Sequence, residues 1–152
     1  MFMLATPTAQ RLHLPDLAAT EALGRRIAAL LRPGDAILLD GPLGAGKSAL
    51  ARALIRAAAG DPALDVPSPS YTLVQEYRTA AGPISHYDLW RLPGPGGVVE
   101  LGWDDAREGI VIVEWPDRLG ALRPPDALHL SLRMAVDGSR AADVDGWPGR
   151  AL

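Results

Sequence analysis

The stretch at residues 41–48 reads GPLGAGKS and directly follows the short apolar run AILLD at 36–40. It matches the pattern G-x-x-x-x-G-K-S, whose glycines let backbone N–H groups turn toward an anion with no Cβ atom in the way. The preceding run is typical of a buried parallel strand, and residues 48–59, SALARALIRAAA, are rich in good helix formers. The pattern therefore stands between a strand and a helix, which is the context in which it binds phosphate.

The residue types in this loop predict how a nucleotide would be held. Lys47, the only lysine in the sequence, would reach the β- and γ-phosphates, and the Ser48 hydroxyl would ligate Mg²⁺. The unpaired N–H groups and the positive end of the following helix add to the attraction. No N-K-x-D pattern for guanine follows, which favours ATP and ADP. The expected phosphate-binding residues are Gly41, Leu43, Gly44, Ala45, Gly46, Lys47, Ser48 and Ala49.

Two acids that end apolar runs are candidates for handling the metal and the attacking water. Glu114 ends IVIVE, which resembles a Walker B strand with Glu in place of Asp, and Asp88 ends the weaker run ISHYD. Acids at strand ends hold metal or orient water in phosphoryl transfer. We expect Glu114 to bind Mg²⁺, directly or through water, and Asp88 to orient the water or support the metal; these two roles could be exchanged. Lys47, Asp88 and Glu114 are the predicted catalytic residues.

Four other features near these acids leave alternatives open. A lone histidine such as His86 is more often packed or exposed than a proton shuttle. Arg91 would neutralise phosphate or pair with a surface acid, and Trp115 would wall off the site or face a partner. The loop VPSPSYT at 66–72 either senses the γ-phosphate or metal or only makes turns, through the hydroxyls of Ser68, Ser70 and Thr72.

The rest of the pattern predicts a single-domain α/β fold of the P-loop NTPase type, with a largely parallel sheet flanked by helices. We expect flexible termini at about 1–10 and 136–152. The last dozen residues read as a terminal strand or a frayed tail, and LPGPGG at 92–97 as irregular. The other expected elements are strands at 11–14, 71–77, 84–89, 110–115 and 127–134, a turn at 78–83, a helix from near Asp16, and a brief helical segment from 98.

The composition of the chain limits which binding partners and which cellular compartment we expect. The net charge is −3 and no Lys/Arg cluster stands out, so the chain is a poor binder of DNA or RNA by itself. No run of about 18 apolar residues exists that could span a bilayer, and no secretory signal is recognisable at the N-terminus. The absence of cysteine excludes disulfides and thiolate metal sites. We expect a cytoplasmic protein.

Several segments together resemble one family. GPLGAGKS, SPSYTLVQEY, HYDLWRL, VELGWDD and IVIVEWPDRL, in this order, are similar to the TsaE (YjeE) family of small bacterial ATPases that take part in threonylcarbamoyladenosine modification of tRNA. The resemblance runs from about residue 12 to about residue 134. The glycine loop alone fits many P-loop proteins, whereas its combination with the other segments is specific to this family.

The resemblance implies an ATPase that binds the TsaB and TsaD proteins and uses ATP hydrolysis to drive or reset their cycles, meeting tRNA only through that complex. It implies Mg²⁺ ligands at Ser48 and Glu114, an essential aspartate at Asp88 and a conserved tryptophan at Trp115. The family segment LPDxxxT implies contacts to the adenine side from Asp16 and Thr20. Ser48 and Ser70 stand where the family has threonine, and Trp90 where it has tyrosine.

Two other functions are compatible with a P-loop. A small-molecule kinase needs an arginine-bearing lid and an acceptor pocket, and between Glu114 and the strand expected at 127–134 only Arg118 and Arg123 are available. A nucleotide-dependent scaffold with incidental ATPase activity would look similar by sequence. Phosphate release with and without TsaB and TsaD separates these functions.

Overall fold

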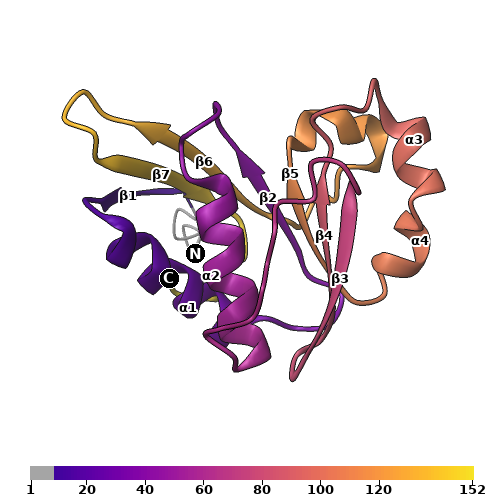
Figure 1. Ribbon diagram of the computed structural model, residues 1–152, viewed down its shortest axis with the longest axis horizontal. Helices are drawn as coiled ribbons and strands as arrows, with labels where there is room; N and C mark the ends of the chain where they lie inside the picture. The colour runs from indigo at the N-terminus through magenta and orange to yellow at the C-terminus, as the bar shows by residue number, and fades with distance from the viewer. Residues whose placement is uncertain (1–8) are drawn as a thin grey trace, which may run out of the picture.

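The computed structural model describes residues 9–152, so most of the N-terminal segment expected to be flexible lies outside the described residues. Within them, seven strands form one mixed sheet in the order β1-β7-β6-β2-β5-β4-β3 (Figure 1). The elements are β1 (Gln10–Leu14), α1 (Leu17–Leu30), β2 (Ala36–Asp40), α2 (Lys47–Ala59), β3 (Val74–Thr79), β4 (Gly82–Asp88), α3 (Pro95–Glu100), α4 (Trp103–Ala106), β5 (Ile110–Glu114), the 3₁₀ helix η1 (Pro116–Leu122), β6 (Leu128–Met134) and β7 (Arg140–Asp145).

The centre of the sheet is parallel and its edges are antiparallel. Strand β2 pairs in parallel with both β5 and β6, and β4 pairs in parallel with β5. Strands β1 and β7, β6 and β7, and β3 and β4 pair antiparallel. The predicted α/β fold is confirmed, and its parallel part consists of the four strands that end beside the glycine loop.

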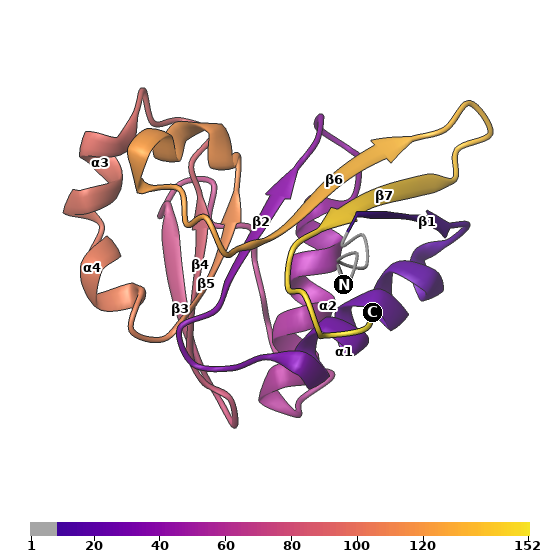
Figure 2. The same cartoon turned by 180° about the vertical axis from the view of Figure 1, so that it is seen from behind.

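Each face of the sheet packs on its own set of helices. In Figures 1 and 2, α1 and α2 lie on one side of the sheet, whereas α3, α4 and η1 lie beyond the other. Alternate residues of β5 reach the two sides: Ile110 and Ile112 join the core under α1 and α2, and Val111 and Val113 join the core under the shorter helices. A strand buried on both faces reads as a continuous apolar run, which explains the sequence IVIV.

Helix α1 begins where the sequence predicts. The side chain of Asp16 accepts a hydrogen bond from the backbone N–H of Ala19 at 2.9 Å, which is an N-cap bond. None of the helices in residues 9–152 has the length and apolar character needed to cross a membrane.

Three local predictions differ from the structure. Strand β3 begins at Val74 because Leu73 is left-handed, with φ 69°. The turn after β3 is tighter than the expected 78–83, since pairing continues to Thr79 and Gly82. The prediction that 92–97 is irregular is wrong from Pro95 onward: this proline opens α3, where its missing N–H costs nothing.

The chain beyond residue 136 is packed against the fold, where we expected a flexible tail. Of the two alternatives for the last dozen residues, the strand is what the structure has, through β7, and Trp147 behind it is buried. Arg150 then makes two hydrogen bonds to the Asp35 carboxylate, at 2.6 and 3.0 Å, and its guanidinium lies 4.3 Å from the Trp147 ring centroid. These contacts attach the C-terminal segment to the start of β2.

We predict that Arg150→Ala lowers the free energy of unfolding by about 2 kcal/mol, because hydrogen bonds to a charged group are lost and the buried Asp35 carboxylate keeps, among the described residues, only the Arg32 N–H, at 2.7 Å. Chemical denaturation measures the change. The control is Arg26→Ala, at an exposed position of α1 whose side chain makes no hydrogen bond or ion pair with the rest of the described chain; it should stay within about 0.5 kcal/mol of wild type. Equal stabilities for the two variants would contradict a stabilising role of the Arg150–Asp35 contact.

Candidate functional site

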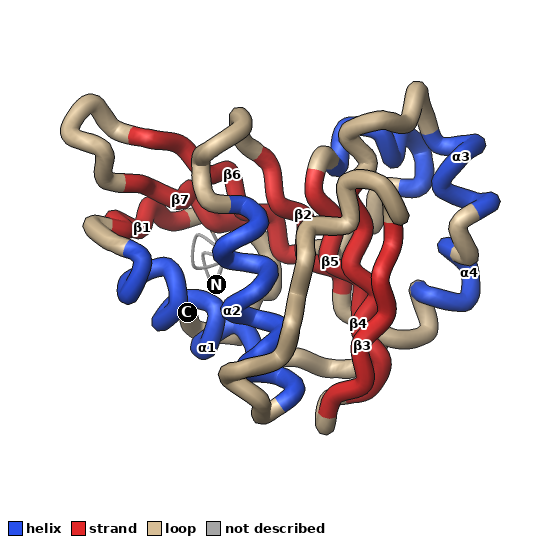
Figure 3. The backbone as a smooth tube through the Cα atoms, viewed as in Figure 1, coloured by secondary structure: helices blue, strands red, loops and turns tan. Residues whose placement is uncertain are grey.

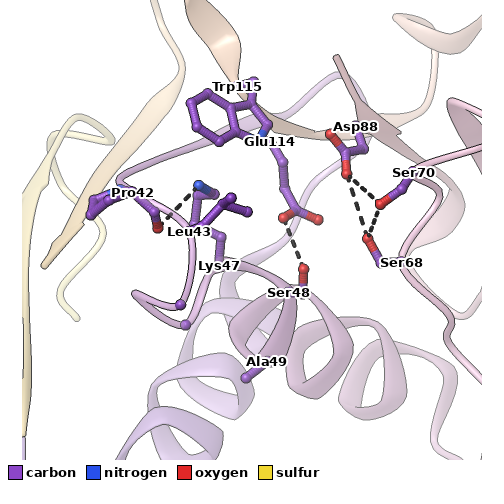
Figure 4. A pocket seen from close by; sticks show the side chains of 12 residues that line it. Pro42, Leu43, Lys47, Ser48, Ala49, Ser68, Ser70, Asp88, Glu114 and Trp115 are labelled. Carbon is purple, nitrogen blue, oxygen red and sulfur yellow. Dashed lines mark hydrogen bonds between the residues drawn. The ribbon is translucent and has the colours of Figure 1, made fainter. Parts of the chain in front are cut away.

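The carboxyl ends of β2, β4 and β5 meet the start of α2 around one cavity of about 230 Å³ (Figure 4). The long loop after α2 returns along that helix to the same edge of the sheet (Figure 3). The cavity is lined by the glycine loop, the first turn of α2, the returning loop and two strand ends: Pro42, Leu43, Gly44, Gly46, Lys47, Ser48, Ala49, Ser68, Ser70, Asp88, Glu114 and Trp115.

Glycine is required at two points of the loop. Gly41 has φ 139°, and a Cβ atom there would collide with the backbone carbonyl oxygen of Leu132 in β6. Gly46, with φ 105°, is the N-cap of α2 and turns the chain into the helix. The first N–H groups of α2 are therefore presented at the cavity, together with the positive end of the helix dipole, which is the arrangement that attracts anions.

Lys47 is buried at the base of the loop, with 5% of its surface exposed. Its Nζ donates hydrogen bonds to the carbonyl oxygen of Gly41 and, at 3.4 Å, to that of Pro42, and it lies 4.0 Å from the ring centroid of Trp115. Burial lowers the pKa of this ammonium group, and the negative charges of Glu114 and Asp40 oppose part of that effect. Among the described residues no carboxylate forms a direct ion pair with this ammonium group, and an incoming anion would supply one.

Glu114 and Ser48, both predicted metal ligands, are in contact. The Ser48 hydroxyl donates to Oε1 of Glu114 at 3.0 Å. The carboxylate is 2% exposed, and its other oxygen lies 2.7 Å from Nε2 of His86. Of the two expected environments of His86, packed or exposed, the structure has the packed one, and its contact with Glu114 is one that sequence reasoning did not foresee.

Asp88 lies beside Glu114, because the two residues are register partners in β4 and β5. Its Oδ2 accepts from the hydroxyls of Ser70 at 3.2 Å and Ser68 at 3.5 Å, and its Oδ1 accepts from the Trp90 backbone N–H at 3.1 Å. The hydroxyls of the returning loop thus contact the predicted water-orienting acid in this structure.

The donors fit Mg²⁺ in chemical type. This ion takes oxygen ligands and commonly uses one or two protein groups together with water and phosphate oxygens. Ser48 and Glu114 would hold it, with Asp88 close by. No group of three or more His, Cys, Asp or Glu side chains suited to a metal occurs in residues 9–152, so protein side chains alone would not enclose the ion.

Trp115 forms a wall of the cavity, which was one of its two predicted roles. Its backbone is left-handed, with φ 60° and ψ 56°, and its ring lies 5.0 Å from that of the half-exposed Trp90, measured between centroids. Arg91 does not line the cavity; its guanidinium lies 5.5 Å from the ring centroid of the exposed Tyr71.

Asp16 and Thr20 are not brought into the cavity. Asp16 caps α1 and Thr20 is buried within that helix. Their contact with adenine stays a prediction. Gly41 and Ala45 belong to the loop without lining the cavity.

Arg140, which the sequence reasoning missed, supports the glycine loop from β7. Its Nη2 donates to the carbonyl oxygen of Gly44 at 2.9 Å. No local motif marks this arginine, because the strand that carries it lies almost a hundred residues beyond the loop. Only the pairing of β7 with β6 places it there.

Comparison with known proteins decides the family. The model of the family described as "Threonylcarbamoyl adenosine biosynthesis protein TsaE" matches residues 14–142, a span that contains every residue lining the cavity. The chain belongs to the TsaE family. The resemblance seen in the sequence is thereby confirmed.

Relatives agree with this assignment, and a solved structure shares the fold. Proteins named tRNA threonylcarbamoyladenosine biosynthesis protein TsaE are 33% identical in Rickettsia felis, over 82% of this chain and 73% of the relative, and 39% identical in Synechocystis, over 72% and 71%. The crystal structure of Bacillus subtilis YdiB superposes with a TM-score of 0.77 at 23% identity, covering 95% of this chain and 90% of that one. YdiB thus shares the fold of this TsaE-family chain.

We predict that the Lys47 ε-amino group titrates below the ordinary pKa of lysine, because burial disfavours its charged form. NMR of isotope-labelled lysine measures this with a single side-chain signal, since the sequence has one lysine. The unfolded chain keeps this proton to higher pH, so the free energy of unfolding should rise with pH between the folded-state pKa and the ordinary value.

Glu114→Gln is the matched variant for this titration. It removes the largest of the charges that raise the pKa of Lys47, so the pKa should fall further. A pKa at or above the ordinary lysine value in the wild-type protein would contradict the account of a desolvated ammonium group.

Proposed function

We propose that this TsaE-family protein binds ATP with Mg²⁺ in the described cavity and hydrolyses it, acting with TsaB and TsaD in threonylcarbamoyladenosine modification of tRNA. One observation carries the proposal. A buried lysine, a helix N-terminus and two strand-end carboxylates converge on one cavity within a family of threonylcarbamoyl adenosine biosynthesis proteins.

The residues divide the chemistry between them. Lys47 exchanges its bonds to the loop carbonyls for the β- and γ-phosphate oxygens, where its charge offsets the charge that spreads over the transferred group. Ser48 and Glu114 hold Mg²⁺, which supplies further neutralisation of the phosphates. Asp88, on the neighbouring strand, orients the attacking water and accepts its proton.

The surroundings of the cavity support a partner that covers it. Apolar side chains are exposed around the site, at Leu43 (75%), Tyr71 (88%) and Trp90 (47%), and exposed apolar groups near a functional cavity are typical of protein contacts. The net charge of −3 argues against independent tRNA binding, so tRNA would be reached through TsaB and TsaD. A protein acting on tRNA in this way would work in the cytoplasm.

Lys47→Ala should reduce ATP turnover at least about 100-fold, because the mutation removes a charge that stabilises the transferred phosphoryl group. Phosphate release with Mg²⁺ and ATP, with and without TsaB and TsaD, measures the loss. Arg26→Ala serves as the surface control. Full activity of Lys47→Ala would reject the proposal, and transfer of the γ-phosphate to a metabolite without the partners would favour the kinase function instead.

Kinetic measurements should distinguish the roles of the two carboxylates, Asp88 and Glu114. Asp88→Asn is expected to keep ATP affinity within about threefold and lose at least about 100-fold in kcat, since an amide cannot accept the water's proton. Glu114→Gln should instead raise the Mg²⁺ concentration needed for half-maximal turnover. If Asp88→Asn shows the Mg²⁺ effect and Glu114→Gln does not, the two roles are exchanged.

A further inference from the structure

A buried histidine that the mechanism does not use lies directly behind Glu114. His86 is 1% exposed, and its Nε2 is 2.7 Å from Glu114 Oε2, while Glu114 Oε1 accepts from Ser48. We propose that His86 is a positioning residue, which fixes the Glu114 carboxylate so that Oε1 faces Ser48 and the metal position between them. This inference deepens the proposed ATPase function and rests on it.

The sheet register explains why the histidine reaches this carboxylate. His86 pairs with Ile112, and Asp88 with Glu114, in the parallel ladder of β4 and β5. Because side chains two residues apart on a strand share a face, all four lie on the face that α2 covers. His86 therefore lies two residues before Asp88 in β4, farther from the carboxyl end of the strand than the two acids. The Glu114 carboxylate lies between His86 and Ser48 at the cavity.

The unpaired nitrogen of His86 identifies the donor in this contact. Within residues 9–152, its buried Nδ1 has no hydrogen-bond partner. A proton on Nδ1 would be a buried donor without an acceptor, and it would leave the Nε2 lone pair facing a carboxylate oxygen at 2.7 Å. The proton therefore sits on Nε2 and is donated to Glu114, which is a hydrogen bond strengthened by the carboxylate charge.

This bond constrains a side chain that would otherwise be held by the Ser48 hydroxyl alone. Glutamate has three rotatable side-chain bonds, and among the described residues the Glu114 carboxylate is hydrogen-bonded only to His86 and Ser48. A lone pair of the Ser48 oxygen can ligate Mg²⁺ while its O–H still donates to Oε1, so the bonds from Ser48 and His86 would together fix both oxygens of the carboxylate in the loaded site. Outer partners of this kind typically contribute about 10–100-fold to metal affinity or activity.

The test compares two amide variants of similar polarity. Gln at position 86 places its side-chain N–H about where Nε2 lies and keeps a donor for Glu114, whereas Asn is too short to reach it. We expect His86→Asn to raise about 10-fold the Mg²⁺ concentration that half-maximally strengthens ADP binding, measured by calorimetry, with ADP affinity in the absence of Mg²⁺ unchanged. His86→Gln should restore the wild-type Mg²⁺ response.

A second measurement needs no nucleotide. In ligand-free crystal structures, Glu114 Oε1 should stay within hydrogen-bonding distance of Ser48 Oγ in His86→Gln and leave it in His86→Asn. Any of three results would overturn the positioning role. The first is an equal Mg²⁺ response for wild type and His86→Asn, and the second is an unmoved Glu114 in the His86→Asn structure. The third is an equal loss of the Mg²⁺ response in both variants when their melting temperatures are equal. If the wild-type protein binds no nucleotide, the proposed function fails, and the ligand-free structures still decide the role of His86.

Discussion

The parallel register of β5 between β2 and β4 is the constraint on which the site depends. Glu114 is opposite Leu39 in β2 and opposite Asp88 in β4, so the acids end at the level where the chain leaves β2 for the glycine loop. A slip of one residue would carry Glu114 to the other face of the sheet, away from α2 and Ser48. Two independent apolar cores, one on each face, hold this register in place.

The buried polar groups of the site bind one another. Lys47 bonds to loop carbonyls, Ser48 and His86 bond to Glu114, and Asp88 accepts from Ser70. A buried polar group without a partner costs about 1–3 kcal/mol, so these hydrogen bonds stabilise the arrangement of the site. A ligand that enters this cavity would therefore have to replace existing bonds. That requirement favours a ligand that brings several charged oxygens at once over a single small anion.

The sequence predicts the parts of the site whose determinants are local. The strand, glycine loop and helix around Lys47 follow from adjacent residues, and acids at strand ends follow from the edge at which parallel strands terminate. The bonds of His86 to Glu114 and of Arg140 to Gly44 join residues 28 and 96 positions apart, and they exist only through strand pairing. Sequence patterns show which residues of a strand alternate between its two faces. They do not show which strands lie next to it or in which register they pair.

The conformation of Trp115 connects the protein surface with the glycine loop. A proline follows it, which disfavours the right-handed helical region, and the left-handed backbone it adopts costs on the order of 1–3 kcal/mol for a residue other than glycine. Its ring packs between the Lys47 ammonium group and the half-exposed Trp90. Both contacts offset the strain, because cation–π and aromatic pairs each contribute about 0.5–1.5 kcal/mol. A partner that displaces Trp90 would therefore remove the aromatic contact that helps to keep the Trp115 ring over the Lys47 ammonium group.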